Sequence, residues 1–194
     1  MKCYLKQILF LYATLLFIGC SSVPDWLSNK WDLISYGNEP QGLFGDINAD
    51  ALGKRFYWEI HGNTIDGYMQ EGWQGSIISL FSDNTKPTSN SFEKRTNCKF
   101  NIISSTSNEC QIELIDGTEL YPIASMVTPR EVNPGEIIFF RRLNRRRIAM
   151  DRKVNLNENS VQNQAANMLM QQSSSLIEVN GDTYHRLILG KSQK

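Results

Sequence analysis

The feature that most constrains the fold is a pair of alternating segments joined by a Gly-Asn dipeptide. Apolar and polar side chains alternate in residues 56–61 and again in residues 64–69, which is the period of a β-strand with one buried face. Gly-Asn between two such segments predicts a two-residue β-hairpin. In that register the apolar side chains share one face, and Glu59 lies directly opposite Asp66. The chain is therefore predicted to contain antiparallel β-structure.

The same signals recur along the chain. Turn-forming Asn, Asp and Gly residues separate further apolar or alternating runs, and Asp116-Gly117 predicts a second hairpin. Together these runs give about eight or nine strands, whose spacing predicts a mainly β fold, an antiparallel barrel or sandwich. The further expected strands are residues 31–36, 76–81, 111–115, 119–123, 136–140, 176–179 and 183–189.

Two segments depart from the strand pattern. Residues 82–97 contain one large apolar residue, Phe92, and are expected to form a long exposed loop. Residues 155–175 are rich in Asn, Gln and Ser, yet their few apolar residues recur at helical spacing. This spacing predicts one amphipathic helix in the C-terminal third, near residues 158–172, with a polar linker as the alternative.

Composition places the chain among ordinary globular proteins. It has 194 residues, 41% of them hydrophobic, with 20 Lys and Arg against 20 Asp and Glu. These values are typical of one domain and exclude a polytopic membrane protein or a wholly disordered chain. The charges are unevenly placed, because residues 20–140 carry 8 basic and 16 acidic groups whereas residues 141–194 carry 10 and 4. An acidic body is followed by a basic C-terminal third.

The N-terminus has the pattern of an export signal. Two lysines precede an apolar run from Ile8 to Ile18, which is shorter than the about 20 residues needed to span a bilayer. Gly19 before Cys20 resembles the lipobox of bacterial lipoproteins, in which the cysteine thiol is acylated and becomes the mature N-terminus. Phe17 departs from that pattern, which usually has Leu three residues before the cysteine.

This resemblance implies an anchored, exported protein. Residues 1–19 would be the signal peptide, residues 20–28 a lipidated Cys20 with a short tether, and residues 29–194 a single β-rich periplasmic domain. Ser21 after the cysteine implies, in such lipoproteins, release to the outer membrane, so the protein would face the periplasm with its lipid in that membrane. Ordinary signal-peptidase cleavage after residue 22 is the alternative.

Export also bears on the remaining cysteines. Cys98 and Cys110 are the pair left in an oxidising compartment, so a disulfide between them is predicted. A simple hairpin of residues 99–103 with residues 110–115 would hold them more than about 15 Å apart, at ~3.3 Å per residue. The disulfide and this hairpin therefore exclude each other, and the disulfide is the prediction retained.

The sequence contains no recognised catalytic motif. The nucleophile elbow, the zinc-binding His-Glu-x-x-His motif and the glycine-rich phosphate and dinucleotide loops are all absent. No cofactor or metal ligand set is predicted. The two histidines, His61 and His185, lie far apart in sequence, and a His-dependent envelope hydrolase is only an alternative. Glu59 and Asp66, with His61 on the same face, could form a cation or acid–base site, or simply extend into water.

The strongest candidate surface is a run of basic residues. It carries seven positive charges against one negative, more than a mixed solvated face. In an exported lipoprotein its partners would be an anionic envelope component or an acidic protein, not nucleic acid; the alternative is a solvated or internally paired face. The basic residues are Arg141, Arg142, Arg145, Arg146, Arg147, Arg152 and Lys153.

These observations favour a non-enzymatic binding or assembly module, held to the membrane through its N-terminal lipid. A lipocalin-like carrier of a small apolar ligand is a second alternative, because a closed barrel can hold one such molecule. Residues 31–36 (WDLISY) after the lipoprotein leader are loosely similar to the first strand of lipocalin-like and META-type barrels.

Overall fold

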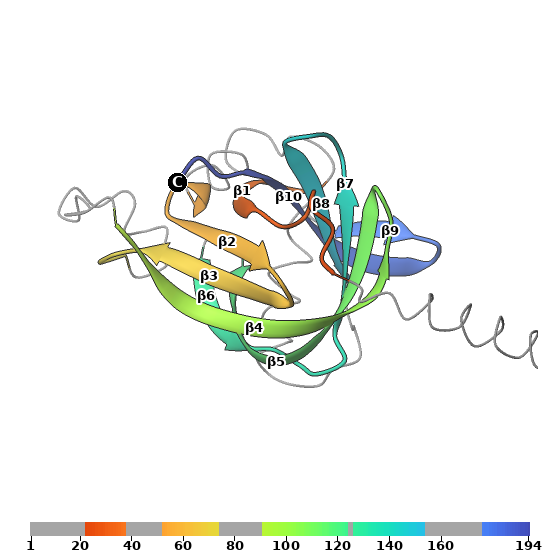
Figure 1. The fold of residues 1–194 in the computed structure, drawn as a ribbon, viewed down its shortest axis with the longest axis horizontal. Helices are drawn as coiled ribbons and strands as arrows, with labels where there is room; N and C mark the ends of the chain where they lie inside the picture. The colour runs from red at the N-terminus through yellow and green to blue at the C-terminus, as the bar shows by residue number, and fades with distance from the viewer. Residues whose placement is uncertain (1–21, 38–51, 74–90, 124–125, 154–175) are drawn as a thin grey trace, which may run out of the picture.

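The computed structural model describes residues 22–37, 52–73, 91–123, 126–153 and 176–194 (Figure 1). The strands formed by these residues are β1 Lys30–Tyr36, β2 Phe56–His61, β3 Thr64–Gln70, β4 Phe92–Ser105, β5 Glu109–Ile123, β6 Met126–Glu131, β7 Ile137–Arg142, β8 Arg147–Lys153, β9 Leu176–Val179 and β10 Asp182–Lys191. Eight strands form a closed antiparallel barrel in the order β1-β2-β3-β4-β5-β7-β8-β10, and pairing of β1 with β10 closes it. Strands β6 and β9 pair with β5 and β10 outside this circle. Because the sheet closes on itself, the fold is the barrel and not the sandwich.

The hairpin predicted at residues 56–69 forms as expected, and the strands expected at residues 176–179 and 183–189 also pair as a hairpin. Strands β2 and β3 pair with Glu59 opposite Asp66, and Gly62 in the turn has a positive φ of 52°. The β9–β10 turn has two consecutive positive φ angles, at Asn180 and Gly181. This conformation matches the twist of the flanking strands, which explains why Asn-Gly occurs there.

The barrel interior is filled by large side chains. Trp31, Phe56, Phe100 and Phe140 are all less than 2% exposed and come from four different strands. Each buried side chain of this size contributes about 2 kcal/mol or more of apolar transfer free energy. In β7, buried residues alternate with more exposed ones, whereas Phe56 lies in β2, where the neighbouring Tyr57 and Trp58 are buried as well.

The expected hairpin at Asp116-Gly117 does not form. Strand β5 runs through this dipeptide, pairing with β4 and β7 before it and with β6 after it. Ile115 is an extra residue in the β4–β5 ladder, and Gly117 has a φ of 101°. A side chain at Gly117 would collide with the carbonyl oxygen of Asn97. The turn signal therefore marks a β-bulge that bends one long strand.

The predicted disulfide is wrong, because the competing hairpin forms instead. Strand β4 pairs with β5 so that Cys98 lies opposite Gly117 while Cys110 lies opposite Ser105. Seven residues of β4 separate the two positions, about 23 Å at 3.3 Å per residue. Both cysteines are free and buried, and burial raises the pKa of the Cys98 thiol to about 12.

The loop expected over residues 82–97 is also partly wrong, since β4 begins at Phe92. Glu93, Lys94 and Arg95 at the start of β4 are all exposed, so this part of the strand has the polar composition of a loop. The predicted strand at residues 76–81 and the helix near residues 158–172 lie outside the described residues, as do the signal peptide and Cys20. Within the described part of the chain, no helical segment has the length and hydropathy required to cross a bilayer.

Candidate functional site

Five of the predicted basic residues lie at one end of the barrel. We call residues 141–147 the arginine loop: the end of β7, the connection and the first residue of β8. The connection is fixed by its own hydrogen bonds. Arg146 donates its backbone N–H to Oδ1 of Asn144 at 2.8 Å, and Leu143 donates to the carbonyl of Arg147 at 3.0 Å. An Asn side chain that accepts from the backbone two residues later is a recurrent turn device, so the loop has a defined shape.

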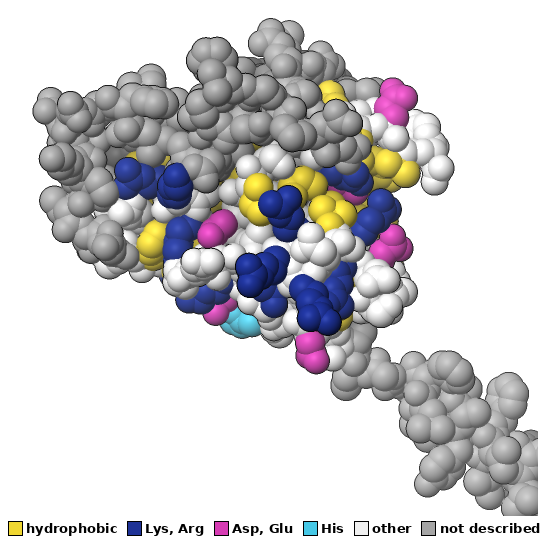
Figure 2. Space-filling model, turned by 90° about the horizontal axis from the view of Figure 1, so that it is seen from above, with side chains coloured by type: hydrophobic (Ala, Val, Ile, Leu, Met, Phe, Trp, Pro, Cys, Tyr) yellow, Lys and Arg dark blue, Asp and Glu magenta, His cyan; other side chains and the backbone are white. Residues whose placement is uncertain are grey.

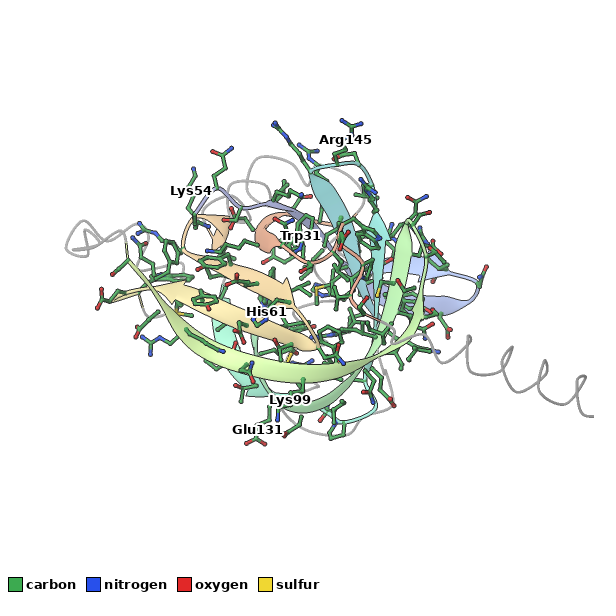
Figure 3. All side chains as sticks on the ribbon, viewed as in Figure 1. Trp31, Lys54, His61, Lys99, Glu131 and Arg145 are labelled. Carbon is green, nitrogen blue, oxygen red and sulfur yellow. The ribbon has the colours of Figure 1, made fainter. Side chains whose placement is uncertain are left out.

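Most of the arginines of the loop have no counterion in the part of the chain that the structure describes. Arg141 pairs with Glu109 at 3.1 Å, but both side chains are about half exposed. Among the described residues, no acidic side chain pairs with the other four arginines of the loop. Figure 2 shows Lys and Arg side chains gathered on the described part of the upper face, and Arg145 projects away from the barrel in Figure 3. The loop therefore presents an uncompensated positive charge.

An open hollow of about 780 Å³ lies beside the loop. Thr106, Asn108 and Glu109 of the β4–β5 turn line one side, and residues 141–145 line the other. The two sides are joined by a hydrogen bond from the backbone N–H of Arg142 to the carbonyl of Asn108 at 2.7 Å. A shallow space bordered by arginine and amide groups suits the oxygens of a carboxylate or phosphate.

The other two predicted residues lie at the opposite end of β8, and neither joins the arginine loop. Lys153 pairs with Asp182 at 2.8 Å. Arg152 is 4% exposed on the core face of β8, where it pairs with Glu119 at 2.7 Å and Glu136 at 2.8 Å. Arg130 also contacts both glutamates. Arg152, Arg130, Glu119 and Glu136 form an internal ionic network, which we call the buried network. Arg152 therefore does not belong to the basic surface that the sequence predicted.

The buried network controls the charge of its neighbours. Burial tends to raise the pKa of Glu119, but the Arg152 and Arg130 charges and hydrogen bonds hold it below its usual value. Burial and the same two positive charges lower the pKa of His185 to about 3. His185 is 3% exposed and neutral at physiological pH, so it packs as an uncharged ring.

The facing carboxylates of the first hairpin do come together with His61. Asp66 is 3% exposed, and its carboxylate lies 2.7 Å from Nζ of Lys94, 2.5 Å from Nδ2 of Asn97 and 3.1 Å from Nε2 of His61. Burial tends to raise the pKa of Asp66, but these hydrogen bonds outweigh it and lower the pKa. Lys94 thus offsets the repulsion from Glu59. Within the described residues, no three His, Cys, Asp or Glu side chains are grouped as a metal site.

Sequence reasoning missed the partners that come from other strands. Lys94 and Asn97 lie in the segment assigned to a loop. Glu119 lies on β5, which does not pair with β8, and Glu136 directly precedes β7, so neither contact with Arg152 follows from a local pattern. The signal for Lys94 was the repulsion expected between Glu59 and Asp66, which a basic neighbour is one way to relieve.

No protein-family model, curated protein or solved structure matches this chain.

Proposed function

We propose that this protein is a non-enzymatic binding module of the bacterial cell envelope, anchored in the outer membrane through an acylated Cys20 and facing the periplasm. Its arginine loop binds an anionic envelope component. The observation that carries the proposal is that Arg142, Arg145, Arg146 and Arg147 stand on a fixed loop with no acidic partner among the described residues.

The loop has enough charge to act by electrostatics. Each basic side chain close to an anionic surface contributes about 1 kcal/mol, and salt screens this attraction. Several side chains on one short loop therefore give an affinity that is useful at low ionic strength and falls as salt is added. Because the loop is already ordered, little conformational entropy opposes binding.

Two observations support binding by this surface over the alternatives. His185 is buried and its pKa is lowered to about 3, so it is a weak base that is poorly suited to activating a nucleophile. The interior positions of the described strands hold bulky aromatic side chains, including Trp31 and Phe100, where a lipocalin-like carrier would need space for its ligand.

A sedimentation experiment tests the proposal. The chain from residue 20 with Cys20→Ser retains every described strand and lacks the lipid. We expect it to sediment with isolated envelope fragments at low salt. Replacing Arg145, Arg146 and Arg147 with Gln should weaken this binding by up to about 100-fold, from about 1 kcal/mol per charge, with an unchanged melting temperature.

A matched variant controls for loss of net charge. Arg95, Lys99 and Lys153 are exposed basic residues outside the arginine loop, and replacing all three with Gln removes the same charge. This variant should bind like the parent chain. Equal weakening by both triple variants would mean that net charge, not the arginine loop, attracts the fragments, and no binding by the parent would refute the proposal.

A further inference from the structure

The N-terminal segment packs at the same end of the barrel as the arginine loop. Val23 and Leu27 belong to the hydrophobic core, and Leu27 is fully buried. Trp26 donates its Nε1 hydrogen to the carbonyl of Thr106 at 3.2 Å. Thr106 lies in the β4–β5 turn and lines the hollow beside the arginine loop. Residues far apart in sequence thus place the entry of the chain next to the basic surface.

This packing shortens the expected tether. The sequence assigned residues 20–28 to a lipidated Cys20 with a short tether, whereas Val23 and Leu27 already pack in the core. Two residues, Ser21 and Ser22, separate Val23 from Cys20. The three Cα–Cα steps between them span at most about 11 Å in a fully extended chain. A lipid on Cys20 therefore holds this end of the barrel close to the bilayer surface.

The surface held there has the chemistry of a membrane contact. Arginine guanidinium groups bind phosphate oxygens through paired hydrogen bonds. Lys191 adds another exposed charge, and its backbone N–H donates to the carbonyl of Arg146 at 2.9 Å. Among these charges lies Leu143, an apolar side chain that is 46% exposed. An apolar residue surrounded by basic residues is typical of segments that lie in the membrane interface.

We infer that the arginine loop docks onto the same membrane that holds the lipid anchor, with its arginines on headgroup phosphates and Leu143 in contact with the acyl chains. The inference rests on the proposed function, because it requires the anchor at Cys20 and an anionic partner for the loop. It goes further by naming that partner as the lipid surface. A tether of two residues favours lipid over a protein or cell-wall partner, because little space remains for another macromolecule between this end of the barrel and the bilayer.

The test uses the mature lipidated protein reconstituted in vesicles. Leu143→Cys and, as a control, Lys99→Cys are each labelled with an environment-sensitive fluorophore. Labelling is selective because Cys98 and Cys110 are buried. Lys99 lies on a different side of the barrel from Arg145 (Figure 3). Both variants carry the anchor, so attachment alone cannot distinguish them.

In vesicles that contain phosphatidylglycerol, we expect quenching by brominated acyl chains to be at least severalfold stronger at position 143 than at position 99. The difference should decrease in vesicles of phosphatidylcholine alone and at high salt, since screening weakens the arginine–phosphate attraction. Equal quenching at the two positions in anionic vesicles would overturn the inference. If the arginine-dependent binding to envelope fragments persisted in that case, the proposed function would stand with a different anionic partner. If that binding were absent too, both the membrane docking and the proposed function would be refuted.

Discussion

At the scale of single residues, burial decides which charged groups contribute to the fold. Arg152 and Arg141 both pair with a glutamate, but the first pair is almost fully enclosed and the second is about half exposed. Exposed pairs contribute little to stability because water and salt screen them. Enclosed pairs become costly to break, because the remaining partner is left charged without a counterion.

This contrast predicts different effects of two equivalent substitutions. Glu119→Gln should destabilise the protein by about 3 kcal/mol, because it leaves Arg152 and Arg130 short of negative charge. Glu109→Gln, which removes the exposed partner of Arg141, should cost less than about 1 kcal/mol. Urea unfolding of both variants at pH 7 measures the difference. Similar free energies of unfolding for the two variants would show that the buried network is unimportant to stability.

His185 predicts a loss of stability in mild acid. Its pKa is lowered to about 3 in the folded protein, compared with about 6.5 in an unfolded chain. As the pH falls below 6.5, His185 binds a proton in the unfolded chain but stays neutral in the folded protein. The free energy of unfolding therefore decreases until the pH approaches 3. Between pH 7 and 5 the loss is about 2 kcal/mol.

Urea unfolding at pH 7 and pH 5 measures this loss, and His185→Phe should remove it. Measurements above pH 5 report on the titration of His185 without contributions from Asp66 and Glu119. The lowered pKa values of these carboxylates make them lose their contribution only in stronger acid. A His185→Phe variant with the same pH dependence as the parent would assign the effect to another group.

At the scale of elements, the long strand β5 depends on a bend. Gly117 permits this bend through its positive φ and because its missing side chain leaves room for Asn97. On either side of the bend, β5 has different partners, first β7 and then β6. The bend therefore lets one strand belong both to the barrel and to the extra two-stranded ladder.

Gly117→Ala should accordingly destabilise the protein by about 3 kcal/mol, from backbone strain and the collision with Asn97 together. Gly62→Ala is the matched control, because Gly62 also has a positive φ but has open space around it. That variant should cost about 1 kcal/mol, from the backbone conformation alone. Thermal unfolding of both variants tests this, and equal melting temperatures would show that the close approach to Asn97 is relieved by a small movement.

The sequence predicted those elements whose information is local. The β2–β3 register follows from alternation and the Gly-Asn turn, so Glu59 and Asp66 were placed correctly. The bend at Gly117 looked like a turn because Asp-Gly suits both, and only the partners of β5 distinguish them. A disulfide between Cys98 and Cys110 was predicted because they were the two cysteines left in an oxidising compartment. The β4–β5 register places them at different points along the ladder, too far apart to bond.

At the scale of the whole molecule, closure of the barrel sorts the basic residues. Strand β8 carries Arg147 at one end and Lys153 at the other, so a cluster in sequence becomes two separate sites. Closure pairs β1 with β10, the first and last strands of the described residues. No local pattern encodes such a contact, which is why the sequence left barrel and sandwich open.

The anchor gives a prediction at this scale. Cys20→Ser should abolish acylation and move the protein from the membrane fraction to the soluble fraction at high salt, where the arginine loop is screened. At low salt, part of the protein should remain with membranes through that loop. Fractionation and intact mass check this result, and a variant with unchanged mass and unchanged fractionation at high salt would exclude the lipoprotein assignment.

The core packing of Val23 and Leu27 has a mechanical consequence. A protein on a slack tether tumbles freely, and a pull on its lipid only straightens the linker. Here Leu27 also accepts the Nε1 hydrogen bond of Trp31, at 2.9 Å, so the entering chain is joined to the first strand of the barrel. Any force between lipid and domain therefore reaches the barrel directly. With the proposed lipid on Cys20, the domain would keep one orientation relative to the membrane, with the same surface always facing the periplasm.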